Sequence, residues 1–299
     1  MLASVMSKQA WSRHSTYAFV LLPTTYYISS MSENLVHTVC TDSFEMEYAQ
    51  IGCGDKPLVI IPGLSIKSVM KSAASLEGPF KIFKDNYTLY FFDRKKEAKI
   101  GYSLEEMADD QVAALKAMGI ENADVYGVSQ GGMIAQYMAI RHPGVVHKLV
   151  LGSSTSKAEP RQITTIQNWA RLARAHDASA LVNAFIDDCF TESFATRYRR
   201  ALLALYKEVS DEEMERFAIF ADACDDVNTY DDLGKIKCPV LVLGAGKDLV
   251  TTPEASAKLA EKLKAEGVPC DFFMYQDNGH AVFDELPDYK KRILEFLER

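Results

Sequence analysis

A serine between two glycines is the feature of this chain most suited to covalent chemistry. Ser129 stands in the pattern Gly127-Val-Ser129-Gln-Gly131. An apolar run over 123–128 predicts a buried strand before it, and the pattern over 130–141 predicts a helix after it. A serine on such a sharp turn exposes its hydroxyl above the sheet, and the two glycines leave room for the turn. Ser129 is therefore a predicted acyl-transfer nucleophile, the alternative being a serine that merely caps the helix.

A serine hydroxyl is a poor nucleophile at neutral pH, so it needs a base nearby and an acid that orients this base. His280 follows the last predicted strand, over 270–275, and this position puts it at the carboxyl edge of the sheet with Ser129. We predict that His280 is the base rather than a polar surface residue of a loop. The other histidines lie near the start of the chain, beyond the helix that follows Ser129, before a strand, or in a helical region: His14, His37, His142, His147 and His176.

Asp248 is the predicted acid, because it directly follows an apolar strand over 239–244. The order Ser129, Asp248, His280 is the chain order of one known triad architecture. Asp277 is a competitor, but it lies only three residues before His280 and is more suited to shaping that turn. The alternative for Asp248 is an ordinary turn aspartate.

Negative charge that develops on a substrate carbonyl oxygen needs two preorganised N–H donors. The backbone N–H of Gln130, directly after Ser129, is one predicted donor. The other is expected from the loop 62–65, Pro-Gly-Leu-Ser, with Leu64 as the donor. Without the serine motif this loop would be read as a simple Pro-Gly turn.

Alternating strand and helix patterns from residue 35 onward predict an α/β fold with a mostly parallel sheet covered on both faces. Segments 35–40 and 44–51 are expected to form an opening antiparallel pair. Between 156 and 229 the strands disappear and apolar residues recur at helical spacing, so we expect a helical cap there. The predicted core is then 31–155 with 230–299. Further predicted strands are 58–61, 87–92 and 148–152, and further helices are 103–118, 253–267 and 287–299.

Composition narrows the class of protein. The chain has 299 residues, of which 48% are hydrophobic and 25% charged, as in ordinary globular proteins. A net charge of −8 and the lack of a long basic run argue against nucleic acid as a partner. Six scattered cysteines without a Cys-x-x-Cys pair indicate reduced, mostly buried thiols in a cytoplasmic protein, and no zinc site. No metal or organic cofactor is expected.

The first thirty residues differ from the rest because they contain no Asp or Glu. Their apolar stretch, 17–22, is too short to cross a bilayer and lacks a clear cleavage site, so a membrane partner is not expected. A signal or transit peptide is the alternative for this segment. Met31 opens a segment of normal composition. We predict that 1–30 is a disordered or artefactual extension.

Together these motifs resemble the α/β-hydrolase superfamily over nearly all of 35–299 outside the predicted cap. The matching features are the serine motif with Gly-Gly-Met-Ile-Ala-Gln beyond it, Arg-His-Pro after its helix, the Asp248 loop and Asn-Gly-His280. The resemblance implies an eight-stranded sheet with a helical cap, and its nearest members look like small esterases and enol-lactonases. Two positions depart from the family pattern: Pro62-Gly63 replaces His-Gly, and segment 93–103 replaces Asp-x-Arg-Gly-x-Gly-x-Ser.

The function predicted from the sequence is hydrolysis of a small ester, thioester or lactone through an acyl-enzyme on Ser129. Trp169 and the phenylalanines of the cap are expected to line an apolar pocket for this small-molecule substrate, although such aromatics are more often plain core. Carbon–carbon bond hydrolysis and acyl transfer are the alternatives on the same fold. A non-catalytic ligand receptor is the alternative from another class.

Overall fold

A computed structural model describes residues 35–299, so the predicted extension over 1–30 lies outside the described residues. The described chain builds one eight-stranded sheet in the order β1-β2-β4-β3-β5-β6-β7-β8. Its first two pairings, β1 with β2 and β2 with β4, are antiparallel, and all the others are parallel. The strands are β1 (Val36–Cys40), β2 (Glu45–Ile51), β3 (Lys56–Ile61), β4 (Tyr87–Lys95), β5 (Ala123–Val128), β6 (Val146–Gly152), β7 (Val240–Ala245) and β8 (Cys270–Tyr275).

The central strands are buried on both faces. Every residue of β5 and of β7 is buried, which explains why both read as continuous apolar runs rather than alternating ones. Because β3 to β8 are parallel, their carboxyl ends lie at one edge of the sheet, and the loops that follow β3, β5, β7 and β8 start there. This edge holds the residues that the sequence singled out.

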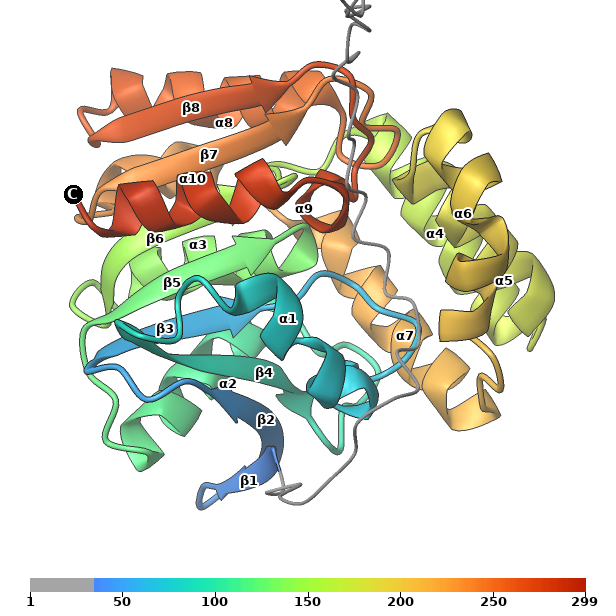
Figure 1. Ribbon diagram of the computed structural model, residues 1–299, viewed down its shortest axis with the longest axis horizontal. Helices are drawn as coiled ribbons and strands as arrows, with labels where there is room; N and C mark the ends of the chain where they lie inside the picture. Colours follow the sequence, from blue (N-terminus) through green and yellow to red (C-terminus); the bar gives the residue numbers. More distant parts are fainter. Residues whose placement is uncertain (1–34) are drawn as a thin grey trace, which may run out of the picture.

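Helices cover both faces of the sheet, as the sequence predicted (Figure 1). In that view α1 and α10 cross in front of the sheet, while α2, α3 and α8 lie behind it. Each face has its own apolar core, one including Phe80 and Ile293 and the other including Leu115, Ile134 and Leu259. These helices are α1 (Glu77–Phe80), α2 (Leu104–Ala117), α3 (Gln130–Arg141), α8 (Pro253–Ala265) and α10 (Pro287–Leu297).

Helix α2 begins with a capping box that was visible in the sequence. The N–H of Glu106 donates to Ser103 Oγ at 3.2 Å, and the N–H of Ser103 donates to Glu106 Oε2 at 2.9 Å. Ser103→Ala removes one of these bonds, so we expect the free energy of unfolding in urea to fall by about 1 kcal/mol. Ser43→Ala, at an exposed turn serine, should leave it unchanged. Equal stability of the two variants would contradict this role for Ser103.

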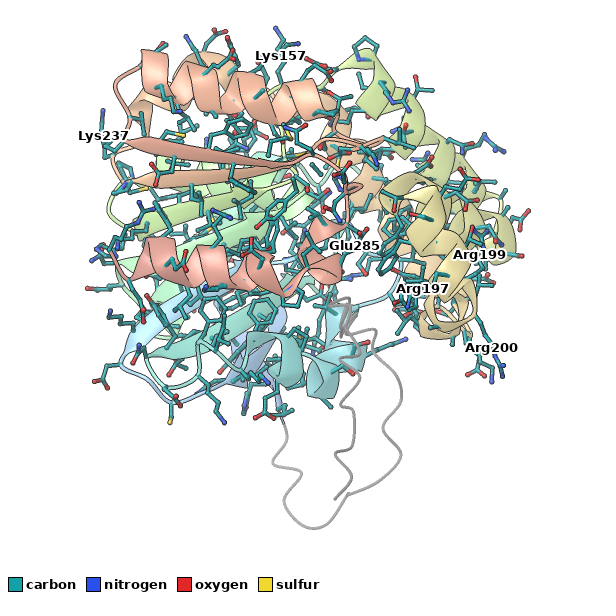
Figure 2. All side chains as sticks on the ribbon, turned by 45° about the horizontal axis from the view of Figure 1, so that its top comes forward. Lys157, Arg197, Arg199, Arg200, Lys237 and Glu285 are labelled. Carbon is teal, nitrogen blue, oxygen red and sulfur yellow. The ribbon has the colours of Figure 1, made fainter. Side chains whose placement is uncertain are left out.

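Four α-helices occupy the segment predicted as the cap, and they lie beside the sheet in Figure 1. An isolated antiparallel bridge between Lys157 and Asn228 joins the two ends of this segment. Figure 2 shows Arg197, Arg199 and Arg200 of α6 on the side far from Lys237, which precedes β7. The limits 156 and 229 remain a proposal. The helices are α4 (Pro160–Arg174), α5 (Ala178–Cys189), α6 (Glu192–Leu205) and α7 (Asp211–Ala223).

Some short helices of the structure were not predicted from the sequence. They are the single-turn helix α1, the 3₁₀ helices η1 (Val69–Ser75), η2 (Cys224–Asp226) and η3 (Tyr230–Lys235), and α9 (Val282–Glu285). All six cysteines have free thiols, but only three are buried, so "mostly buried" was too strong. Within residues 35–299 no helix is long and apolar enough to cross a membrane.

Candidate active site

Ser129 sits on a sharp turn between β5 and α3. Its φ of 53° and ψ of −121° lie in a region that non-glycine residues rarely adopt. A Cβ on Gly127 would approach Gly132 Cα to 2.8 Å, and one on Gly131 would approach Pro62 O to 2.6 Å. Both glycines are therefore required by the close passage of neighbouring backbone, as the sequence predicted.

Ser129, His280 and Asp248 form one hydrogen-bonded chain. His280 Nε2 lies 2.9 Å from Ser129 Oγ, and His280 Nδ1 lies 2.8 Å from Asp248 Oδ2. Their exposed fractions are 8% for Ser129, 4% for His280 and 3% for Asp248, so bulk water barely reaches them. Ser153 fixes the histidine loop by donating from Oγ to the His280 carbonyl at 2.8 Å. The three residues come from loops after β5, β8 and β7.

The Asp248 carboxylate is held from several sides. The N–H groups of Val250 and Thr251 donate to Oδ1 at 2.8 and 2.9 Å, and Thr251 Oγ1 donates to Oδ2 at 2.8 Å. Burial alone would raise the pKa of Asp248, but His280 and these hydrogen bonds outweigh it and hold this pKa below its usual 3.8. Asp248 is therefore an anion at neutral pH.

The competing carboxylate, Asp277, lies elsewhere. Its side chain is 93% exposed and faces Lys247 at 3.4 Å. His142 and His147 pair with carboxylates remote from Ser129, namely Asp109 and Asp124. Two further described histidines also lie apart from Ser129: His37 packs against Tyr48 with tilted rings, and His176 pairs with Asp211.

The loop after β3 passes directly beside the serine. A Cβ on Gly63 would lie 3.1 Å from Ser129 Cβ and 3.7 Å from Ser129 Oγ, so the backbone that leads to Leu64 borders the hydroxyl. Gln130 is the first residue of α3, and backbone N–H groups in a first helical turn have no partner within the helix. The two predicted donors, Leu64 and Gln130, thus belong to segments that border Ser129, and their role in binding an oxyanion remains a proposal.

The side chain of Gln130 joins this site to two regions that the sequence analysis did not connect. Its Nε2 donates to the carbonyl of Phe220 in α7 at 2.5 Å. Its Oε1 accepts a hydrogen bond of 2.9 Å from Arg94 Nη2. Arg94 was missed because it lies in segment 93–103, where the chain departs from the family pattern. A charged residue at the end of the apolar strand β4 was the signal that could have indicated it.

Gly279, next to His280, lets this loop pack against the end of α5. A Cβ there would lie 2.9 Å from Cys189 O and 3.0 Å from Thr191 N, so Gly279→Ala must push the two segments apart. Since a shift of about 1 Å can cost about a hundredfold in rate, we expect ester hydrolysis to slow by about tenfold to a hundredfold. Gly144→Ala is the matched control, because nothing lies within 4 Å of a Cβ there. Equal steady-state rates for both variants would show that this packing does not matter.

Trp169, a predicted pocket residue, is 2% exposed and lies between helices. Its ring centroid is 4.8 Å from that of Phe185, and its Nε1 donates to Asp188 Oδ2 at 2.8 Å. These contacts favour a packing role, and contact with substrate stays a prediction. Among residues 35–299, no group of three or more His, Cys, Asp and Glu side chains is placed to hold a metal ion.

Known proteins show similarity along most of the chain. The family model for the alpha/beta hydrolase fold matches residues 90–287. The AB hydrolase superfamily protein YisY of Bacillus subtilis is 30% identical over 199 residues, 62% of this chain and 69% of that protein. The 3-oxoadipate enol-lactonase 2 of Acinetobacter baylyi is 23% identical over 234 residues, 76% of this chain and 84% of that protein.

Solved structures agree on the fold. The enol-lactonase from Burkholderia xenovorans LB400 superposes with a TM-score of 0.76 at 19% identity, covering 88% of this chain and 100% of that one. The sheet order, the strained serine turn and the family match over more than half of the chain lead to one conclusion: this chain belongs to the α/β-hydrolase fold family.

Proposed function

We propose that this protein is a serine hydrolase that cleaves a small carboxylic ester, thioester or lactone through an acyl-enzyme on Ser129. The observation that carries this proposal is the 2.9 Å contact between Ser129 Oγ and a histidine that a buried carboxylate holds on its other side. A fold does not fix a function, so the argument depends on this site rather than on the family.

In the first half-reaction His280 Nε2 takes the proton of Ser129 while Oγ bonds to the substrate carbonyl carbon. The carbonyl π electrons move to oxygen, and the N–H groups of Leu64 and Gln130 stabilise the resulting anion. The tetrahedral intermediate then collapses, the bond to the alcohol or thiol breaks, and the leaving group receives the proton from His280. Asp248 keeps the imidazole in the required tautomer throughout.

In the second half-reaction water attacks the acyl-enzyme, with His280 again accepting the proton. The second tetrahedral intermediate releases a carboxylic acid and returns the proton to Ser129 Oγ. In a lactone the leaving oxygen stays tethered, so the product is a single hydroxy or keto acid. None of these steps calls for a group beyond the side chains and backbone named above.

Two observations support a small substrate. The three residues are at most 8% exposed, so a substrate has to be small enough to reach nearly buried side chains. The similar proteins from Acinetobacter baylyi and Burkholderia xenovorans are named enol-lactonases. A lactone is a cyclic ester, so this name describes hydrolysis of a cyclic ester.

Turnover of a substrate panel tests the proposal. It comprises p-nitrophenyl esters of increasing acyl length, a matching thioester, simple and enol lactones, and a vinylogous diketone. We expect release of the acid from at least one ester, thioester or lactone, and none after Ser129→Ala. Cleavage of the diketone alone would favour carbon–carbon bond hydrolysis, and transfer to an added alcohol in place of water would favour an acyltransferase. Tight ligand binding without any turnover would favour a receptor.

A further inference from the structure

Arg94 is a buried cation that the mechanism above does not use. It is the residue before the last of β4, at the same edge of the sheet as Ser129, and only 3% of its surface is exposed. Within residues 35–299 no carboxylate lies at ion-pair distance from its guanidinium, and its buried Nε has no hydrogen-bond partner. Burying a charge without a close counter-ion is costly, which suggests that the position serves more than stability.

One nitrogen of Arg94 bridges two loops. Nη2 donates to the carbonyl of Pro62 at 2.8 Å and to Gln130 Oε1 at 2.9 Å. Pro62 lies two residues before Leu64, and Gln130 directly follows Ser129. Because β3 lies between β4 and β5 in the sheet, the side chain reaches across the end of β3 to the residue after β5. It thereby joins the two backbone segments that hold the proposed oxyanion donors.

Neighbouring groups fix this bridge in place. Asp93 Oδ1 accepts from the N–H of Arg94 at 2.7 Å and from Arg216 Nη2 at 3.1 Å. Arg216 Nη2 also donates to the Arg94 carbonyl at 3.1 Å and thus ties α7 to the end of β4. Gln130 Nε2 is occupied by Phe220 O, so its Oε1 is left facing Arg94.

Arg94 remains a cation in this environment. Burial lowers the pKa of Arg94 to about 10, Asp93 opposes this shift, and Arg216 adds to it. At neutral pH the guanidinium still carries its proton, and its field next to Gln130 favours negative charge on a bound oxygen.

We propose that Arg94 is a positioning residue of the oxyanion hole, which holds the Pro62–Leu64 loop and Gln130 in register so that both backbone N–H groups point at one oxygen. The inference depends on the function proposed above. It concerns the transition state specifically, because the two N–H groups are needed most when the oxygen carries full negative charge.

Arg94→Met, which keeps an unbranched apolar stem and removes the guanidinium donors, tests this role. We expect kcat for the best ester of the panel to fall by about tenfold to a hundredfold with KM nearly unchanged. Affinity for a trifluoromethyl ketone, whose adduct with Ser129 places an oxyanion in the hole, should fall by the same factor. If Arg94 only stabilised the fold, the loss in kcat and the loss in affinity for the trifluoromethyl ketone would not be equal. Arg174→Met, at an exposed arginine of α4 that pairs with Asp222, is the matched control and should change neither value.

A double-mutant cycle adds a second test. If Arg94 acts through Gln130, adding Gln130→Met to Arg94→Met should slow the enzyme little further. If Arg94→Met does not fold, as judged by its thermal transition, Arg94→Lys replaces it, because the shorter ammonium cannot hold both acceptors in place.

Unchanged kcat and inhibitor affinity in the folded Arg94 variant, or effects that multiply in the double variant, would overturn the inference. Those results would leave the hydrolase proposal standing, since they require an active wild-type enzyme. Failure of the wild type to turn over any ester, thioester or lactone would instead refute the proposed function itself.

Discussion

Ser129→Ala is expected to lower kcat for the best substrate of the panel by about a millionfold, the loss seen when a serine hydrolase loses its nucleophile. The reason is that His280 Nε2 is hydrogen-bonded to the Ser129 hydroxyl, and both residues are buried, so the variant loses the hydroxyl that the base faces. The measurement is steady-state hydrolysis with purified wild-type and variant protein at saturating substrate.

The matched control is Ser43→Ala, at an exposed serine in the turn between β1 and β2, which should keep full activity. Thermal unfolding should be similar for both variants, so a loss of activity cannot be assigned to a loss of folded protein. An alanine variant at 129 that retains even a tenth of the wild-type kcat would rule out the acyl-enzyme on this residue.

Asp248→Asn is expected to lower kcat by about ten-thousandfold, with KM changed far less. An amide can donate a hydrogen bond to Nδ1, which favours the tautomer whose Nε2 already carries a proton and cannot take that of Ser129. The side chain at 248 should otherwise stay in place, because its hydrogen bonds from Val250 and Thr251 need only a carbonyl-type oxygen.

Asp277→Asn provides the matched comparison, since Asp277 precedes the same histidine but is almost fully exposed. We expect kcat within about twofold of wild type, as for most surface substitutions. A large loss at 277 together with a small loss at 248 would reverse the assignment of the acid.

Asp248 should also contribute stability in a pH-dependent way. Its folded-state pKa is lower than the usual 3.8, so its contribution is full above the unfolded-state pKa and is lost as the pH falls through the folded one. The difference in free energy of unfolding between wild type and Asp248→Asn should therefore shrink from about pH 5 to about pH 3. Urea denaturation at both pH values measures it. A difference that grows on acidification would contradict the lowered pKa.

Much of the fold and three of the site residues could be predicted from local signals. The loops of Ser129, Asp248 and His280 each follow an apolar strand, and parallel strands bring such loops to one edge. His280 Nε2 and Ser129 Oγ are in hydrogen-bond contact, as expected for two residues that follow parallel strands of one sheet. The serine turn itself was predictable because only glycine fits at 127 and 131.

The features that the sequence does not predict depend on contacts between distant segments. Arg94 stands in the charged run Arg94-Lys-Lys-Glu97 of the sequence. That its guanidinium reaches past the end of β3 to Gln130 follows only from the order of the strands in the sheet. Helical spacing predicted helices in 156–229, but not that the carbonyl of Phe220 would meet the residue after the serine. The short elements α1 and α9 are too brief to leave a periodic pattern.

The central claim is that an ordinary alcohol becomes reactive through its buried histidine and carboxylate partners. Reaction with a fluorophosphonate, followed by peptide mass spectrometry, measures this most directly, because the reagent needs an activated serine but no particular substrate. We predict rapid stoichiometric addition at the peptide that contains Ser129, and slow addition after Asp248→Asn. Addition elsewhere, or no addition to folded wild-type protein, would contradict the account.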